Sequence, residues 1–320
     1  MTIGNTPRHK PPTVPTLPDG RPRILFCGAT TLDTIFLVDT LPTGPGKVLP
    51  KRMIAAAHGM AASAATAAAR LGAEAVLFSR LGEDETGRRI CDELTGAGVD
   101  CSGVRRFAGV TSSISTVIVE DSGERLVLPF YDPALPADPG WLPLDRAAQA
   151  DAVLVDVRWP EGAAALLDAA RAAGKPAVLD ADVGAREVLL DLARRATHVV
   201  FSEPGACIAS GKETPEAALA SLANQLDGLV AVTLGARGCI WIEDGETRHA
   251  PGHAIRAVDT LAAGDIFHGA FTWALSQGAP LQDCMDIANA AAAIKCQTFG
   301  GRLGAPDRAD IIRFLQQVAT

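Results

Sequence analysis

The segment of the chain best suited to chemistry runs from Asp259 to Asp265, with the sequence Asp-Thr-Leu-Ala-Ala-Gly-Asp. The apolar run that follows it, Ile266 to Trp273, predicts a helix. Small residues before a helix leave backbone amides open at its N-terminus, where these N–H groups and the helix dipole attract an anion such as a phosphoryl group. Asp265 could accept a proton from an attacking hydroxyl there, or it could simply cap the helix. These residues alone leave both interpretations open.

The rest of the chain must supply a scaffold for this segment. Short apolar runs alternate with helical stretches rich in Ala, Leu and Arg, which predicts a mainly parallel sheet with helices on both faces. We expect strands at 23–28, 75–78, 152–157, 177–179, 198–202, 230–234 and 239–243. Two hairpins fall outside this alternation, at about 34–57 and 111–131, and predict a small β-sheet lid.

Composition limits the classes of function. The chain has 320 residues with 48% hydrophobic and 21% charged content, which suits one large α/β domain. A net charge of -8 disfavours a nucleic-acid partner, and the seven scattered cysteines indicate neither a disulfide framework nor a zinc site. Residues 1–22 contain six prolines and no apolar run, so they predict a disordered tail before an ordered domain at 23–320. We expect a cytoplasmic protein without a membrane segment.

The Asp259 to Asp265 segment resembles the D-T-x-G-A-G-D signature of the ribokinase-like (PfkB) carbohydrate kinases, and Ala262 stands where that signature has glycine. The resemblance implies a three-layer α/β/α ribokinase-like fold with a β lid, and transfer of the γ-phosphoryl group of MgATP to a sugar hydroxyl. It implies that Asp265 is the catalytic base and that the amides of Ala262, Ala263 and Gly264 form the anion hole. The Cβ of Ala262 is accommodated only if this residue has a negative φ and its Cβ faces away from the phosphate.

Two glycine-rich segments extend the likeness to the nucleotide site. Residues 233–238 resemble the T-x-G-x-x-G nucleotide loop of the family, and residues 300–306 resemble its C-terminal glycine loop near the adenine. The resemblance implies ATP contacts from Thr233, Gly235, Gly238, Gly300 and Gly301. Taken alone, residues 233–238 are more usually explained as a glycine turn that joins two strands, and residues 300–306 could be a surface turn.

The expected metal site departs from the family pattern. Many relatives carry N-x-x-E after a central strand, whereas this chain has Phe-Ser-Glu-Pro-Gly at 201–205. Glu203 either orders Mg²⁺ through water or only begins the next helix. Mg²⁺ is expected because ATP is delivered as its magnesium complex, in which the metal offsets phosphate charge.

The sugar side is expected near the N-terminus. Residues 28–33 resemble the first strand of the family and the aspartate that binds sugar hydroxyls, although Asp33 could instead satisfy loop amides. His58 and Gly59 stand in the place of the glycine-rich sugar-binding turn, with His58 where glycine is usual. His58 either contacts the substrate or fills the space of a different sugar.

The likeness is strongest to the sulfofructose kinases of this family, which phosphorylate 6-deoxy-6-sulfofructose. Leu41-Pro42-Thr43 with Gly46-Lys47, and Asp156-Val157-Arg158-Trp159, are among the segments that carry it. Arg158 follows a predicted strand at the sheet edge where open α/β proteins bind ligands, and Lys47 lies in the lid. Two cations that converge on one end of a sugar would select a sulfonate or phosphate. Isolated Lys and Arg residues are more often solvated charges.

Two other functions stay open. Aromatic residues in the lid pocket, with Phe130, Tyr131 and Trp159 as candidates, would indicate a kinase for a nucleoside or another small alcohol. Ala262 and the missing N-x-x-E would suit a sugar- or nucleotide-binding regulatory protein without catalysis, but the retained Asp265 argues against it. Exposed lid strands favour pairing with a second subunit, so we predict a homodimer through the lid.

Overall fold

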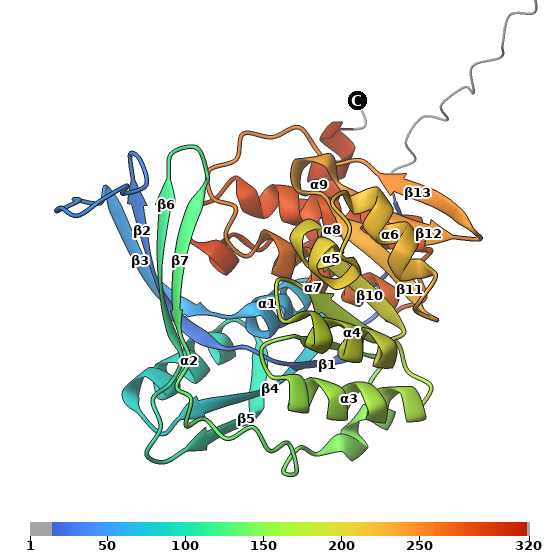
Figure 1. The fold of residues 1–320 in the computed structure, drawn as a ribbon, viewed down its shortest axis with the longest axis horizontal. Coiled ribbons are helices and arrows are strands. Elements are labelled where there is room, and N and C mark those ends of the chain that lie inside the picture. Colours follow the sequence, from blue (N-terminus) through green and yellow to red (C-terminus); the bar gives the residue numbers. More distant parts are fainter. Residues whose placement is uncertain (1–14, 319–320) are drawn as a thin grey trace, which may run out of the picture.

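A large twisted sheet forms the centre of the molecule (Figure 1). The computed structural model describes residues 15–318, and within them this sheet has nine strands in the order β13-β12-β11-β10-β9-β8-β1-β4-β5. The strands are β1 (Arg23–Cys27), β4 (Glu74–Gly82), β5 (Val99–Phe107), β8 (Ala152–Asp156), β9 (Ala177–Ala181), β10 (His198–Ser202), β11 (Leu229–Thr233), β12 (Cys239–Glu243) and β13 (Glu246–Ala250). All neighbours from β11 to β5 pair in parallel, whereas β12 and β13 are antiparallel. The predicted mainly parallel sheet is confirmed.

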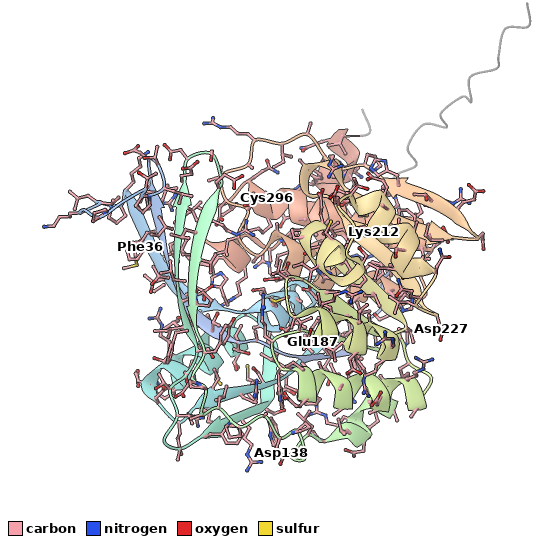
Figure 2. The ribbon with its side chains drawn as sticks, in the orientation of Figure 1. Phe36, Asp138, Glu187, Lys212, Asp227 and Cys296 are labelled. Atoms are coloured by element: carbon pink, nitrogen blue, oxygen red, sulfur yellow. The ribbon has the colours of Figure 1, made fainter. Side chains whose placement is uncertain are left out.

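Helices cover both faces of this sheet, and two separate cores result (Figures 1 and 2). Successive residues of β1 show the division, because Ile24 and Phe26 belong to one core and Leu25 and Cys27 to the other. The first core packs α1 (Met60–Arg70), α2 (Glu85–Gly96), α7 (Ala263–Leu275), α8 (Leu281–Cys296) and α9 (Arg308–Val318). The second packs α3 (Pro160–Ala172), α4 (Arg186–Arg195), α5 (Glu203–Ser210), α6 (Pro215–Ala223) and the 3-10 helix η1 (Leu144–Gln149). This is the expected three-layer α/β/α arrangement.

A smaller sheet stands beside the main one as the expected lid (Figure 1). Its four strands follow the order β3-β2-β6-β7, with bounds β2 (Thr31–Val38), β3 (Arg52–His58), β6 (Ile114–Glu120) and β7 (Arg125–Phe130). One face buries Ile35, Val117 and Val119 against Phe299, while β7 is exposed along its length. The predicted second strand of the first hairpin begins only at Arg52, so Lys47 lies in the loop before it.

The last residues of the predicted tail, 15–22, lie within the described structure. The predicted tail spans 1–22, and residues 1–14 lie outside the described residues. Leu17 is buried in the first core, and Arg308 donates to its carbonyl at 3.0 Å. Residues 15–22 therefore pack on the domain. Between residues 15 and 318, no helix has both the length and the apolar surface needed to cross a membrane.

Candidate active site

Asp265 lies in the first turn of α7, at the end of the loop that follows β13. The helix begins at Ala263, with Ala262 as its N-cap residue, and no side chain within the described residues caps this N-terminus. Asp265 is therefore inside the helix rather than at the cap, and the capping interpretation does not describe it. Amides in the first turn of a helix have no carbonyl four residues earlier to bond. The amide of Ala263 closes a turn onto the Thr260 carbonyl at 3.2 Å.

Ala262 corrects one expectation. The sequence required a negative φ at this position, but the residue has φ 62° and ψ 12°, in the left-handed region. This conformation reverses the chain between the loop and the helix. It costs a residue with a Cβ roughly 1 kcal/mol, which the surrounding packing must supply. The backbone conformation therefore favours the glycine of the family signature, and the alanine is held there under strain.

The carboxyl of Asp265 has the electrostatic setting of a base. Burial raises its pKa well above the usual value for Asp, and the neighbouring carboxyl of Asp180 raises it further. His268, one turn along α7, opposes this shift; its Nδ1 lies 3.3 Å from Asp180 Oδ2 and 2.7 Å from the Gly264 carbonyl oxygen. A carboxylate with a raised pKa accepts a proton more readily near neutral pH than an ordinary Asp.

A pocket of about 560 Å³ opens at the N-terminus of α7. Predicted residues from two distant segments line it together, namely Thr233, Gly235, Gly238, Ala263 and Gly264. Its volume lies within the range of about 300–1,000 Å³ that is typical of ligand and cofactor sites. The pocket therefore has the size and the open backbone that a nucleotide with its phosphates requires.

The glycines of the connection between β11 and β12 are required by its geometry. Gly235 begins the 3-10 helix η2 (Gly235–Arg237) with φ 59°, and Gly238 has φ 88°. A Cβ on Gly238 would lie 2.1 Å from the Ala250 carbonyl oxygen, which excludes every larger residue. Gly300 and Gly301 were also expected to contact ATP, but they do not line this pocket. Their amides instead bind the Asp259 carboxylate, each at 2.9 Å.

Sequence reasoning missed part of this pocket. Its lining also includes residues from the segment before Asp259 and from one face of α8: Gly252, His253, Ala254, Ile255, Ala257, Asn289, Ala292, Ala293 and Cys296. The signal for the second group was the alanine run at 290–293, because small side chains on a helix leave room for a ligand.

On the sugar side, Asp33 lies on β2 and is almost fully buried. Its Oδ1 accepts a hydrogen bond from Thr31 Oγ1 at 2.6 Å. Gly59 has φ 107°, and a Cβ there would lie 2.3 Å from the Ala29 carbonyl oxygen, so the turn between β3 and α1 needs glycine. The structure thus brings Asp33 and Gly59 into the same corner of the fold.

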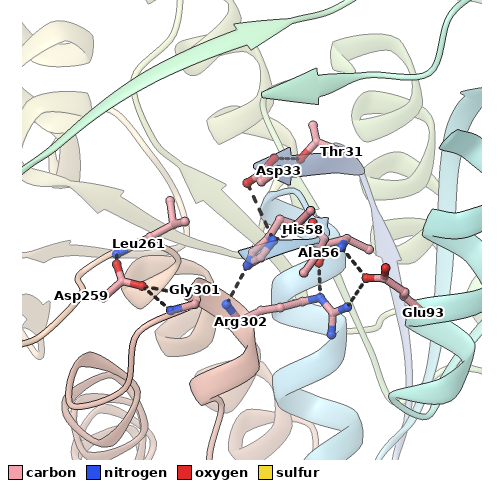
Figure 3. Close-up of polar contacts among 12 residues, drawn as sticks. Thr31, Asp33, Ala56, His58, Glu93, Asp259, Leu261, Gly301 and Arg302 are labelled. Carbon is pink, nitrogen blue, oxygen red and sulfur yellow. Dashed lines mark hydrogen bonds and ion pairs between the residues drawn. The ribbon is translucent and has the colours of Figure 1, made fainter. Parts of the chain in front are cut away.

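His58 lies beneath Asp33 and is 2% exposed (Figure 3). Its Nδ1 is 3.0 Å from the Ala56 carbonyl oxygen and 3.9 Å from Asp33 Oδ2, while its Nε2 accepts from the Arg302 amide at 3.0 Å. This pattern assigns the proton to Nδ1, and burial lowers the pKa of the ring. Both ring nitrogens are engaged within the chain, so contact between His58 and substrate stays a prediction.

Asp156, at the end of β8, is a site residue to which the sequence assigned no role. It is fully buried, and its Oδ2 accepts from the amides of Ala29 and Ala61 at 2.7 and 2.9 Å. Its Oδ1 accepts from the Arg158 amide at 2.8 Å. One carboxylate therefore ties the turn after β1, the start of α1 and the loop after β8 together. The sequence signal that could have identified Asp156 was its position at the end of a predicted buried strand.

Arg158 borders a second, much smaller cavity of about 20 Å³ together with Arg80, Tyr131 and Trp159. Its Nη2 lies 3.8 Å from Asp182 Oδ2. Arg80 stacks over the Trp159 ring at 4.5 Å and donates to the Pro136 carbonyl at 2.8 Å. Lys47 is exposed in the loop between β2 and β3, and the structure does not bring it to this cavity.

Glu203 begins α5, and its Oε2 accepts from Arg237 Nη2 at 2.7 Å. In residues 15–318, no group of three or more His, Cys, Asp or Glu side chains is arranged to hold a metal ion. Mg²⁺ needs no such group when it arrives with the nucleotide, because it keeps several waters and takes phosphate oxygens as ligands. Contact between Glu203 and such an ion through water stays a prediction.

Comparison with known proteins shows the same fold over nearly the whole chain. Residues 21–308 match the pfkB family carbohydrate kinases. An ATP-dependent ribose-1-phosphate kinase from Halopiger xanaduensis is 30% identical over 300 residues, which cover 92% of this chain and 98% of that protein. The ribokinase of Haemophilus influenzae is 26% identical over 306 residues, covering 92% and 99% of the two chains.

Solved structures agree with this assignment. The crystal structure of a proposed ribokinase from Agrobacterium tumefaciens has a TM-score of 0.90 and 45% identity, covering 93% of this chain and 99% of that one. The Arabidopsis thaliana ribokinase complexed with ribose and ATP has a TM-score of 0.79 and 26% identity, with the same coverage. The open N-terminus of α7 and the nucleotide-sized pocket agree with what these relatives show. The chain belongs to the pfkB family of carbohydrate kinases, which use ATP and Mg²⁺ to phosphorylate an alcohol group.

Proposed function

We propose that this kinase phosphorylates a small sugar that carries an anionic substituent, and that Asp265 is its catalytic base. The observation that carries the role of Asp265 is its place in the first turn of α7. Ala263 and Gly264, which precede it, line the nucleotide pocket, and its own carboxyl has a raised pKa. A phosphoryl group held at this terminus lies next to the carboxylate that must accept the proton.

The proposed reaction is an in-line displacement. The sugar hydroxyl oxygen forms a bond to the γ-phosphorus, the bond from this phosphorus to the bridging oxygen breaks, and ADP leaves with that electron pair. The hydroxyl proton passes to the carboxylate of Asp265. The amides of residues 262–264 stabilise the charge on the transferring group. When bound with the nucleotide, Mg²⁺ offsets phosphate charge, and we propose that Glu203 contacts it through water.

The substrate class follows from the other end of the site. We propose that Asp33 binds sugar hydroxyls, and Arg80 and Arg158 both border the cavity of about 20 Å³. Arginine pairs with phosphate or sulfonate oxygens through two parallel hydrogen bonds. The relative from Halopiger xanaduensis acts on ribose 1-phosphate, which is an anionic sugar. A sugar phosphate and 6-deoxy-6-sulfofructose both fit this chemistry, and Lys47 would join only if its loop moves.

A nucleoside is the second candidate substrate. Tyr131 and Trp159 line the small cavity, and aromatic rings are the groups that stack on a base. Burial raises the pKa of the Tyr131 hydroxyl; the charges of Asp33 and Asp265 add to this shift and that of Arg158 opposes it, so Tyr131 lies near the proposed sugar site. This alternative predicts that adenosine is a better acceptor than any anionic sugar.

We also propose that a single kinase domain spans 23–320 and that it forms a homodimer through its lid hairpins, 34–57 and 111–131. Met53, Leu128 and Phe130 on the lid are 57%, 54% and 48% exposed. An apolar surface of this kind on a four-stranded sheet suits a second copy of the same lid.

The test is ADP release from MgATP with ribose, ribose 1-phosphate, fructose, fructose 6-phosphate, 6-deoxy-6-sulfofructose and adenosine as acceptors. Arg158→Ala should raise KM for the preferred anionic sugar about 10- to 100-fold, because a charged hydrogen-bonded pair is lost. Arg248→Ala, which changes an exposed arginine on β13, should leave KM unchanged. Equal losses on neutral and anionic sugars would contradict the proposed substrate class, and a preference for adenosine would favour the second candidate.

A further inference from the structure

The last turn of α8 carries a lysine with no exposed surface. Lys295 is 0% exposed; its Nζ donates to the Asp259 carbonyl at 2.5 Å and lies 3.5 Å from Asp259 Oδ2. Burial lowers the pKa of Lys295, and Asp259 opposes this shift. An isolated buried ammonium group is strongly unfavourable, so a lysine at this position of a helix rich in alanine requires a specific partner. That partner is Asp259, which is also 0% exposed.

The Asp259 carboxylate joins two loops of the nucleotide half (Figure 3). Its Oδ1 accepts from the Leu261 amide at 2.8 Å, directly before Ala262. Its Oδ2 accepts from the amides of Gly300 and Gly301 at 2.9 Å, where the 3-10 helix η3 (Gly301–Gly304) begins. All three amides donate to the negatively charged carboxylate of Asp259, and the ammonium group of Lys295 compensates this charge. The ion pair therefore holds the loop before α7 against the glycine loop.

The same loop also receives the tip of the lid. Arg125, on β7, donates from Nη1 to Thr260 Oγ1 at 2.7 Å, and this hydroxyl donates to the Gly123 carbonyl at 3.0 Å. Thr260 follows Asp259 directly. Asp259, which Lys295 anchors, is therefore adjacent to Thr260, which contacts the lid hairpin. A shift of Asp259 would consequently move the start of α7 and the lid contact together.

We propose that Lys295 is a positioning residue, a cation built into the chain that holds Asp259 and so sets the amides of residues 262–264 relative to the glycine loop and lid. This inference rests on the proposed role of those amides. It predicts that the kinase needs no added monovalent cation. If the lysine side chain is shortened, the space left beside the Asp259 carboxylate and carbonyl has the oxygen ligands that a small cation binds.

The test compares Lys295→Ala, which opens that space, with Lys295→Met, which removes the charge but fills the space. Lys212→Ala is the matched control, because Lys212 is exposed near α5 and α6 (Figure 2). The kcat and the KM for sugar are measured in choline chloride and then in KCl, ammonium chloride and methylammonium chloride. Both Lys295 variants should lose kcat by about 100-fold in choline, as expected when groups around a transferring phosphoryl group are displaced. The small cations should restore kcat in Lys295→Ala alone.

Several outcomes would overturn this proposal: Lys295→Ala with the kcat of the wild-type enzyme, a wild-type enzyme that itself depends on KCl, or equal rescue of the Ala and Met variants. If the single variants do not fold, Lys295→Met with Asp259→Asn removes both charges together. This double variant should fold and keep a low kcat, because the link between the loops is weakened. Recovery of the wild-type kcat would exclude a positioning role.

Hydrogen exchange of the full chain separates this inference from the proposed substrate. The Gly300 and Gly301 amides should exchange faster in Lys295→Ala than in Lys212→Ala, and KCl should slow them again. These amides report on the loops whether or not a sugar is phosphorylated. A wild-type enzyme that phosphorylates none of the sugars would contradict the proposed substrate class alone, whereas unchanged exchange at these amides would contradict the role of Lys295.

Discussion

The nucleotide half and the lid half of this kinase are built in opposite ways. Around Asp259, every carboxylate oxygen is occupied by a backbone amide of the same chain, and the compensating Lys295 is fully buried. On the lid, β7 exposes all of its residues, including the apolar Leu128 and Phe130. The difference teaches that the loops of the nucleotide half are held by contacts within one chain, whereas the lid leaves an apolar surface exposed, which the proposed second copy would cover.

Removal of the catalytic base should have the largest effect and would test the nucleotide half most directly. Asp265→Asn should lower kcat by about 10²- to 10⁴-fold, because the amide accepts no proton. MgATP binding, measured by calorimetry, should stay unchanged. Asp227→Asn alters an exposed carboxyl at the edge of the molecule and serves as the control (Figure 2). Turnover of Asp265→Asn at the control rate would disprove the assignment of the base.

The pH dependence of turnover should show that burial tunes this base. Since burial and Asp180 raise the pKa of Asp265, kcat/KM should fall on the acid side at a pH well above the ordinary Asp value of about 3.9. Below the raised pKa of Asp265, kcat/KM should fall about tenfold for each further pH unit, because the carboxylate is protonated. Asp180→Asn removes the neighbouring charge and should move this limb to lower pH. A limb that stays at the same pH in Asp180→Asn would contradict this explanation.

The lid half can be tested through its exposed apolar surface. Leu128→Glu places a charge in the proposed dimer interface and should convert dimers to monomers in light scattering after gel filtration. Ile208→Glu is matched, because Ile208 is also exposed, at 37%, but lies on α5. Monomers in the wild-type protein, or dimers in both variants, would show that the lid does not pair.

The strain at Ala262 should give the smallest effect. Ala262→Gly relieves the left-handed backbone, but glycine also gains freedom in the unfolded chain, so the free energy of unfolding should rise by less than about 1 kcal/mol. Ala164→Gly in the middle of α3 should instead lower it by roughly 0.5–1 kcal/mol. Urea unfolding measures both changes. A large loss of stability in Ala262→Gly would show that packing of the Ala262 Cβ stabilises the fold by more than the strained backbone destabilises it.

Features that involve only neighbouring residues explain which parts of the structure could be predicted from the sequence. The strands and the two hairpins follow from apolar runs and turn residues, which act over a few positions. The glycines at 59, 235 and 238 were predicted through the family resemblance, and the structure gives the physical reason, because each serves a backbone conformation or close approach that other residues do not tolerate. The sequence left β5 and β13 unassigned, because polar residues alternate with few apolar ones along these outer strands.

The sequence by itself determined the order of the elements, the motif around Asp265 and the family, because periodicity and short motifs are local properties of the chain. Only the tertiary structure decided that His58 accepts from Arg302, 244 residues away, and that Lys295 is buried on Asp259. It also decided that Lys47 stays apart from Arg158 and that Ala262 has a positive φ. Such facts depend on how distant segments pack, and no spacing along the chain encodes the distance between them.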